Sequence, residues 1–237
     1  MQEIANKSVL ITGGSKGIGL GIAHSLVAEG VNVAITSRSA AAAQQAADEL
    51  NSLGKGKALG IVADVRDMKA QEASVAQVIE AWGKLDVLIA NAGLGHFGSI
   101  EDLTAEQWNE TIDINLTGVF NSVKAAIPAL KKTEGYIITI ASLAGTNFFA
   151  GGSAYNASKF GLVGFSQAIM LDLRNYGVRV TTIMPGSVTS YFNNHEPNPT
   201  DSWKIQPEDM GQMVVDLMQM HPRCLPSKIE VRPSRTK

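Results

Sequence analysis

The apolar positions of this chain fall into short, nearly uninterrupted runs that alternate with longer segments in which apolar residues recur at helical spacing. Uninterrupted apolar runs rich in β-branched residues are typical of parallel strands covered on both faces. The pattern predicts strands at residues 8–12, 31–36, 58–63, 85–90, 136–141, 178–184 and 228–231. It predicts helices at residues 17–29, 40–53, 68–82, 105–131, 153–176 and 207–219.

A regular alternation of strands and helices predicts right-handed crossovers that place helices on both faces of one parallel sheet. We therefore expect an α/β fold in which a single doubly wound domain, residues 1–237, carries a seven-stranded sheet. No linker, low-complexity tract or internal repeat interrupts the pattern. The stretch after the sixth strand, about residues 187–206, is rich in Asn, Pro and Asp, and we interpret it as a short lid over a substrate site.

Composition and charge narrow the range of partners. The 237 residues are 45% hydrophobic and 18% charged, with 20 Lys and Arg against 22 Asp and Glu, which suits one soluble domain. The formal charge of −2 provides no overall positive excess for a nucleic acid or an anionic membrane. Cys224 alone cannot form an internal disulfide, and the N-terminus lacks the layout of a signal peptide. We therefore predict a cytoplasmic protein without nucleic-acid or membrane partners.

The first predicted strand runs into the sequence TGGSKGIG, which has glycines at positions 13, 14, 17 and 19 and is followed by a predicted helix. A glycine-rich turn between a strand and a helix is the context of a dinucleotide-binding loop. Glycine permits a left-handed backbone and lets N–H groups approach a pyrophosphate at the helix N-terminus. The residues expected to contact the cofactor here are Gly13, Ser15, Lys16, Gly17, Ile18 and Gly19.

The end of the second strand indicates which dinucleotide binds. An acidic residue at this position would accept a hydrogen bond from the adenosine ribose and repel a 2′-phosphate. The chain instead places Ser37 and Arg38 there, with Lys16 in the glycine loop, and these cations favour NADP(H) over NAD(H). The alternative is that Arg38 and Lys16 are solvated surface charges. Further cofactor contacts are expected after the third and fourth strands, from Asp64, Val65, Asn91 and Gly93.

Polar residues in the second half of the chain indicate an acid–base site. Ser142 lies just beyond the fifth strand, whereas Tyr155 and Lys159 lie one turn apart on one face of the next helix. Reduction of a carbonyl leaves alkoxide charge on oxygen, so the site needs a proton donor aimed at that oxygen. Tyr155 is the candidate donor, and a neighbouring ammonium on Lys159 would lower the pKa of its phenol. Asn115 is a polar residue within the otherwise apolar sequence TIDINLTGVF.

These motifs occur in one order along the chain, namely TGGSKGIG, ANAG, Asn115, Ser142, Tyr155-x-x-x-Lys159 and PG at residues 185–186. The intervals are 27 residues from Asn115 to Ser142, 13 more to Tyr155 and four to Lys159. In this order and spacing, and over nearly its whole length, the chain resembles the short-chain dehydrogenase/reductase family. The resemblance implies a Rossmann-type domain, a nicotinamide cofactor and a catalytic tetrad of Asn115, Ser142, Tyr155 and Lys159.

The resemblance also implies a role for each of these residues. Lys159 would bind the nicotinamide ribose, Ser142 would hold the substrate oxygen, and Asn115 would anchor a water that relays protons to the lysine. Tyr155 and Lys159 would both contact the cofactor as well as act in catalysis. The segment after the sixth strand would contact the nicotinamide carboxamide through Pro185, Gly186, Val188 and Thr189.

The substrate is expected to meet residues that follow the fourth, fifth and sixth strands. These are His96, Phe97, Phe148, Phe149 and Tyr191, whose aromatic content indicates a largely apolar pocket. The alternative for each of them is a place in the core or in an interface between subunits. No histidine of the chain belongs to a metal-ligand constellation, so we predict no metal site.

The sequence therefore predicts an NADPH-dependent carbonyl reductase that converts a small or medium ketone or aldehyde to the alcohol, with Tyr155 as the general acid. The alternatives are a 3-oxoacyl-(acyl-carrier-protein) reductase, an NAD-linked alcohol or sugar dehydrogenase, and a non-catalytic dinucleotide-sensing or scaffold protein. The helix at residues 153–176 is apolar nearly all round and must be covered on more than one side. By the same resemblance we predict a homodimer or homotetramer formed through helices 105–131 and 153–176.

Overall fold

The computed structural model, which describes residues 2–235, contains one sheet of seven parallel strands. The strands are β1 (Ser8–Ile11), β2 (Asn32–Ser37), β3 (Ala58–Val62), β4 (Val87–Ala90), β5 (Tyr136–Ile140), β6 (Arg179–Pro185) and β7 (Lys228–Val231). Their order in the sheet is β3-β2-β1-β4-β5-β6-β7. The order reverses between β1 and β4, and in doubly wound folds ligands bind at the carboxyl ends of the strands beside such a reversal. The predicted fold class is confirmed.

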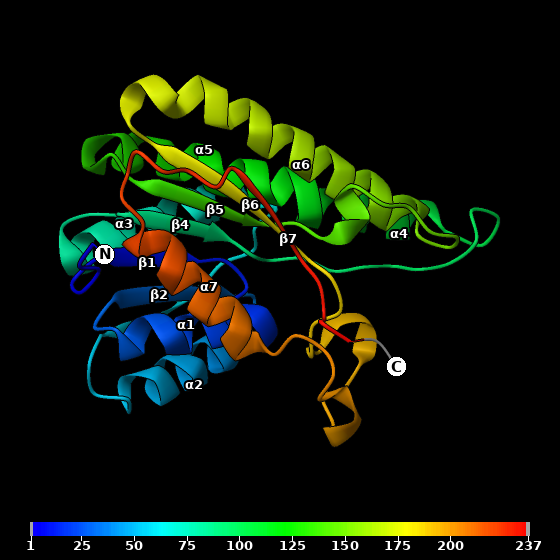
Figure 1. The fold of residues 1–237 in the computed structure, drawn as a ribbon, viewed down its shortest axis with the longest axis horizontal. Helices are drawn as coiled ribbons and strands as arrows, with labels where there is room; N and C mark the ends of the chain where they lie inside the picture. The colour runs from blue at the N-terminus through cyan, green and yellow to red at the C-terminus, as the bar shows by residue number, and fades with distance from the viewer. Residues whose placement is uncertain (1, 236–237) are drawn as a thin grey trace.

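Helices cover both faces of the sheet, as Figure 1 shows. One layer is formed by α1 (Gly17–Ala28), α2 (Ala40–Asn51) and α7 (Pro207–Gln219), and the other by α3 (Met68–Trp82), α5 (Gly118–Thr133) and α6 (Ser153–Leu173). In β1, Val9 and Ile11 pack into the core under the first layer, and Leu10 packs into the core under the second. This alternation explains why the strand is apolar at every position. None of the described helices combines the length and hydropathy needed to cross a membrane.

The helix predicted at residues 105–131 is helical throughout, but it is not a uniform α-helix. The segment divides into α4 (Ala105–Ile112), a π-helical turn η1 (Asp113–Thr117) and α5. At the end of this turn the N–H of Gly118 donates to the carbonyl of Asp113, five residues earlier, so the turn is wider than an α-helical one. Apolar spacing does not reveal such a turn, because the helices on both sides of it keep an apolar face toward the protein. The turn contains Asn115, which is fully buried.

The segment predicted as a lid, residues 187–206, begins and ends side by side. Val188 pairs with Ile205 in a parallel bridge. The N–H of Thr189 donates to the Ile205 carbonyl (2.9 Å), and the N–H of Ile205 donates to the Ser187 carbonyl (3.1 Å). Between these ends lie two short 3-10 turns, η4 (Phe192–Asn194) and η5 (Pro199–Asp201). The segment is therefore a closed loop that follows the carboxyl end of β6.

Apolar side chains remain exposed on the outer surface of α5 and α6. Phe120 and Phe160 are 45% and 42% exposed, and Leu171 is 54% exposed. Phe120 of α5 contacts Phe165 of α6 edge-on, with the ring centroids 6.3 Å apart. The sequence predicts that this surface contacts a second copy of the chain. The homo-oligomer stays a prediction, which sedimentation of the intact protein would test.

Candidate active site

A cavity of about 1000 Å³ lies at the carboxyl ends of the strands. Its walls come from the glycine loop, from the segments that follow β2 to β6, from α6 and from the lid. The residues predicted for the cofactor that line it are Gly13, Ser15, Lys16, Gly17, Ile18, Ser37, Arg38, Asp64, Val65, Asn91, Gly93, Tyr155, Lys159, Pro185, Gly186 and Val188. Gly19 and Thr189, which were also predicted, are buried and do not line it.

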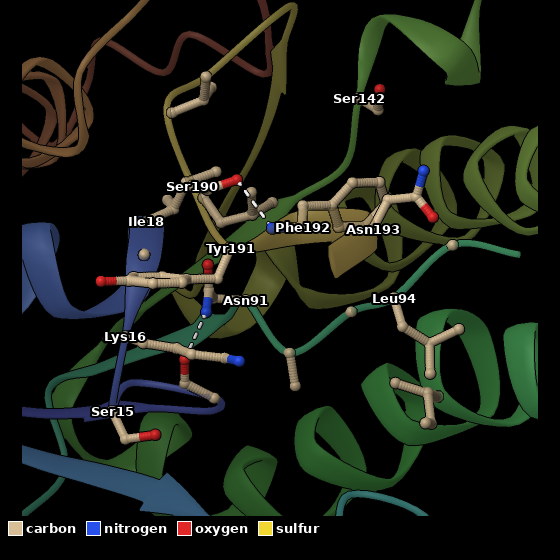
Figure 2. Close-up of a pocket in the computed structure, with 18 of the residues that line it drawn as sticks. Ser15, Lys16, Ile18, Asn91, Leu94, Ser142, Ser190, Tyr191, Phe192 and Asn193 are labelled. Atoms are coloured by element: carbon tan, nitrogen blue, oxygen red, sulfur yellow. Dashed lines mark hydrogen bonds between the residues drawn. The ribbon is translucent and has the colours of Figure 1, made fainter. Parts of the chain in front are cut away.

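The local structure of the glycine loop fits a dinucleotide phosphate. Gly13 and Gly17 have φ angles of +65° and +57°, left-handed values that glycine adopts without strain. A Cβ atom on Gly14 would lie 2.6 Å from a side chain of β2, so close packing also requires glycine there. Nδ2 of Asn91 donates to the Gly13 carbonyl (3.0 Å) and ties the loop to the end of β4 (Figure 2). Lys16 precedes α1 without capping it through its side chain, which leaves the first N–H groups of α1 for an anionic ligand.

Charged side chains border the β2 and β3 end of the cavity. Arg38 follows β2 and Lys16 precedes α1, and both are exposed at the cavity wall. The ammonium of Lys16 lies 5.5 Å from the ring centre of Tyr191 in the lid. Arg66 holds the Asp64 carboxylate through three bonds of 2.6, 3.0 and 3.1 Å, and this pairing lowers the pKa of Asp64. The negative charge of Asp64 is thus neutralised by a partner outside the cavity wall.

The groups predicted to react gather near the carboxyl ends of β5 and β6. Ser142 follows β5, Tyr155 and Lys159 project from the first turns of α6, and all three line the cavity. The phenol ring of Tyr155 packs in a cluster with Phe97 and Phe192, whose ring centroids are 5.3 and 5.4 Å from its own and 6.0 Å from each other. Nζ of Lys159 lies 5.7 Å from the centre of the phenol ring and donates to the last carbonyl of β5 (3.1 Å). A phenol, a hydroxyl and an amine therefore share one part of the cavity wall.

Asn115 takes a different position from the other three predicted catalytic residues, because it is fully buried and does not line the cavity. Its amide binds the backbone of Leu94 from both sides: Oδ1 accepts from the N–H (2.9 Å) and Nδ2 donates to the carbonyl (2.8 Å). Nδ2 also donates to the Ser158 hydroxyl (3.0 Å), which in turn donates to the Tyr155 carbonyl (2.8 Å). Asn115 thus holds the loop after β4 against the helix that carries Tyr155.

Burial controls the protonation of the two titratable groups at this site. It raises the pKa of the Tyr155 phenol, and a hydrogen bond with Ser142 opposes the shift. It lowers the pKa of Lys159 to about 8, because the residue is only 4% exposed and its ammonium loses hydration. The net shift of the phenol pKa is upward, opposite to the lowering expected from Lys159, because the phenolate's loss of hydration dominates. Tyr155 consequently keeps its proton at neutral pH, as a donor must.

Replacing Lys159 by methionine is expected to stabilise the protein near neutral pH by about 2 kcal/mol. Below pH 8 the lysine is charged in the folded and unfolded states, so folding bears the full cost of burying the charge. Between pH 8 and 10.5 the folded state loses this proton first, and the stability of the native protein rises. The advantage of the K159M variant in urea unfolding should therefore shrink as the pH approaches 10.5.

The matched control is Lys228→Met, at an exposed lysine of β7. Its free energy of unfolding should follow that of the native protein at every pH, because an exposed ammonium remains hydrated in both states. A stability difference between K159M and the native protein that stays constant from neutral to alkaline pH would contradict the assignment of a buried, strongly desolvated lysine.

Three of the five residues predicted for the substrate lie at the reacting end or the lid of the cavity. His96 and Tyr191 line it, and Phe97 borders it through its contact with the Tyr155 ring. Nε2 of His96 bonds with a carboxylate oxygen of Glu110 on α4 (2.8 Å). Figure 2 shows Tyr191 turned toward the glycine loop, whereas the next residue of the lid, Phe192, is turned away from it.

The other two, Phe148 and Phe149, do not line the cavity. Phe148 is 84% exposed, and Phe149 lies behind Phe97, with the ring centroids 5.9 Å apart. Both belong to the loop after a 3-10 turn, η2 (Leu143–Gly145). Nδ2 of Asn156 donates to two carbonyls of this segment, at 2.8 Å each, and fixes its course. The expected contact of Phe148 with a substrate inside the cavity is therefore not supported by its position.

Lys204 is a cavity residue that was not predicted from the sequence. It lines the cavity from the end of the lid and pairs with Asp201 at 2.6 Å. The sequence signal for this pair is an acidic and a basic residue three positions apart. That spacing is common among exposed pairs on protein surfaces and does not by itself indicate a ligand site.

Comparison with known proteins adds sequence relatives and a solved structure. The sequence profile of the family described as short chain dehydrogenase matches residues 7–200. Over 191 residues the chain is 39% identical to trans-4-hydroxycyclohexanecarboxylate dehydrogenase of Sinomonas cyclohexanicum, covering 78% of this chain and 74% of the relative. Over 183 residues it is 36% identical to the 3-oxoacyl-(acyl-carrier-protein) reductase FabG of Escherichia coli (strain K12), covering 77% and 73%.

The solved structure is that of an alcohol dehydrogenase from the archaeon Thermococcus sibiricus, described as complexed with 5-hydroxy-NADP. It is similar with a TM-score of 0.91 and 28% identity, covering 98% of both chains. The region matched by the family profile includes the glycine loop and the segment that carries Ser142, Tyr155 and Lys159. Sequence, fold and site thus agree, and the chain belongs to the short-chain dehydrogenase/reductase family of oxidoreductases.

Proposed function

We propose that this protein is an NADP(H)-dependent reductase that converts a ketone or aldehyde of small or medium size to the alcohol. One observation carries the proposal. The protonated phenol of Tyr155 shares a cavity wall with Ser142 and Lys159, and the same cavity continues to the glycine loop and Arg38. A proton donor and a dinucleotide site within one cavity are what the reduction of a carbonyl by hydride transfer requires.

Each side chain at the reacting end has a defined part in this proposal. A bound nicotinamide cofactor would supply the hydride. Tyr155 donates its proton to the carbonyl oxygen as negative charge develops there, and the Ser142 hydroxyl donates a hydrogen bond to the same oxygen. Lys159 attracts the phenolate that is left and favours its formation. Phe97 and Phe192 pack against the phenol and limit the access of water, which strengthens these polar interactions.

The cofactor preference in the proposal is for NADP(H). Arg38 lies at the end of β2, where a guanidinium can form paired, charge-assisted bonds with a 2′-phosphate, and Lys16 lines the same cavity. The pairing of Asp64 with Arg66 weakens the repulsion that its carboxylate would exert on that phosphate. The similar structure from Thermococcus sibiricus, described as complexed with 5-hydroxy-NADP, supports the same preference.

The substrate class is supported by the cavity and by the relatives. The aromatic rings beside Tyr155 favour a substrate with an apolar body. One relative is named for trans-4-hydroxycyclohexanecarboxylate and the other for a 3-oxoacyl-(acyl-carrier-protein), an alcohol in the first case and a ketone in the second. The reduction of a 3-oxoacyl group is the second candidate function, because it needs the same proton donor and hydrogen bonds.

A screen of ketones and aldehydes with NADPH, and with NADH in parallel, tests the proposal. We expect the NADPH absorbance to fall with at least one small or medium carbonyl compound. The kcat/KM for NADPH should exceed that for NADH by about tenfold or more, because a charge-assisted contact to the extra phosphate is lost with NADH. Faster turnover with NADH would favour the NAD-linked dehydrogenase. Binding of NADPH without turnover of any carbonyl class would favour the dinucleotide-sensing alternative.

A further inference from the structure

Asp201, Lys204 and His195 of the lid form a cluster at the edge of the cavity. The Asp201 carboxylate bonds with Nε2 of His195 through one oxygen and with Nζ of Lys204 through the other (2.6 Å). The N–H of Asn198 donates to the same carboxylate (3.3 Å), and the Thr189 hydroxyl donates to the Asp201 carbonyl (3.3 Å). The bonds with Lys204 and His195 lower the pKa of Asp201 to about 2. Asp201 is therefore charged at neutral pH and holds two basic side chains in place.

The side chains of Lys204 and His195 are more exposed to solvent than that of Asp201, with which both bond. The Asp201 side chain is 5% exposed, against 19% for Lys204 and 35% for His195. Lys204 and His195 line the cavity, whereas Asp201 does not. An ammonium has three N–H donors, and the contact with Asp201 occupies one of those of Lys204. The remaining donors are available to a ligand in the cavity.

A basic group backed by a carboxylate occurs a second time in the cavity wall. His96 lines the cavity and bonds with Glu110, which does not line it. Among the described residues that form the cavity wall, the single carboxylate belongs to Asp64, at the end of β3. The cavity wall thus presents the basic nitrogen atoms of these residues, with the carboxylates of Asp201 and Glu110 set behind them. Such a lining attracts an anionic ligand and disfavours a cationic one.

We propose that Lys204, held in the cluster with Asp201 and His195, binds a carboxylate group of the substrate. This inference rests on the proposed reductase function, because it specifies the substrate class of the same site. The N–H of His195 donates to the Phe192 carbonyl (3.2 Å), and the Phe192 ring lies 5.4 Å from that of Tyr155. In Figure 2, Phe192 lies on the side of the cavity away from the glycine loop. An oxo acid would therefore present its ketone to Tyr155 and its carboxylate to Lys204.

Benzoate and benzamide are a matched pair of probes, since they share a shape and differ in charge. With the protein saturated with NADP+, titration calorimetry should show that benzoate binds about tenfold or more tightly than benzamide. Lys204→Gln should weaken benzoate binding by about tenfold and leave benzamide binding within about twofold. Lys204→Arg should retain the preference for benzoate because it retains the charge. Lys228→Gln removes a positive charge from exposed β7 and should change neither affinity.

Three results would overturn the proposal. The first is equal binding of both probes by the native protein. The second is equal weakening of both probes by K204Q, which would show that Lys204 only holds the lid. The third is weaker NADP+ binding by K204Q with the benzoate preference intact, which would assign the cluster to a cofactor phosphate.

Failure of the proposed reductase function would give a different experimental result. It would appear in the native protein as the absence of carbonyl turnover or of NADP+ binding. The benzoate and benzamide titrations are therefore repeated on the protein without dinucleotide. There the preference for benzoate, and its dependence on Lys204, can be measured whether or not the protein proves to be a reductase.

Discussion

Replacing Tyr155 by phenylalanine is expected to lower kcat for carbonyl reduction by roughly a thousandfold and to leave the Kd for NADPH within about twofold. The substitution removes only the phenolic hydroxyl, which the buried environment keeps protonated at neutral pH. The aromatic ring remains in contact with Phe97 and Phe192, so packing at the site should be preserved. Steady-state oxidation of NADPH with a carbonyl compound from the screen measures kcat, and fluorescence titration measures the Kd.

Tyr176→Phe is the matched control for this substitution. Tyr176 follows the end of α6 and is 52% exposed, and it does not line the cavity. Loss of its hydroxyl should leave both kcat and the Kd for NADPH unchanged. A Y155F variant that keeps more than about a tenth of the native kcat would show that another group, or water, supplies the proton. A biological effect that survives Y155F intact would favour the sensing or scaffold alternative.

Replacing Arg38 by aspartate is expected to reduce kcat/KM for NADPH by about a hundredfold and to change that for NADH by less than about threefold. The substitution removes a guanidinium at the end of β2 and adds a carboxylate that repels a 2′-phosphate. NADH lacks this phosphate, and its ribose hydroxyl can donate a hydrogen bond to the new carboxylate. Initial rates over a range of each cofactor, at a saturating concentration of one carbonyl substrate, measure the two values.

The control for charge reversal is Arg223→Asp, at an exposed arginine beyond α7 that does not line the cavity. It makes the same change in net charge as R38D without touching the proposed cofactor site. Both cofactors should retain their native kcat/KM in this variant. An equal loss of kcat/KM for NADPH and NADH in R38D would contradict the NADP(H) assignment, because a general defect of the site would then explain the result.

The elements of the fold could be predicted because each is a local pattern with a single physical cause. β5 is apolar at four of five positions and begins and ends within one residue of the predicted range 136–141. Its parallel neighbours and the helices on both faces require such a run. The π-helical turn at Asp113–Thr117 could not be predicted in this way. Its residue Asn115 bonds with Leu94 and Ser158, which lie far away in the sequence.

Some features of the candidate site could likewise be predicted from local spacing, and others could not. Tyr155 and Lys159 lie four residues apart on one helix, so helical geometry alone places them on one face. Phe148 and Phe192 both belong to segments beyond strand ends, yet Phe192 packs on Tyr155 and Phe148 is exposed. No local spacing distinguishes these two residues. Their positions depend on how each loop is bound to the rest of the protein, as Asn156 binds the first of them.

The sequence by itself determined the doubly wound sheet, the glycine loop, the placement of Tyr155 and Lys159 on one helical face, and the cation at the end of β2. Those features follow from periodicity, backbone freedom and spacing, which are properties of neighbouring residues. The tertiary structure decided that Tyr155 keeps its proton, that the pKa of Lys159 falls to about 8, and that Lys204 and His195 meet across Asp201. The physical reason is that hydration and ion pairing depend on which groups surround a side chain in space, and folding alone brings those groups together.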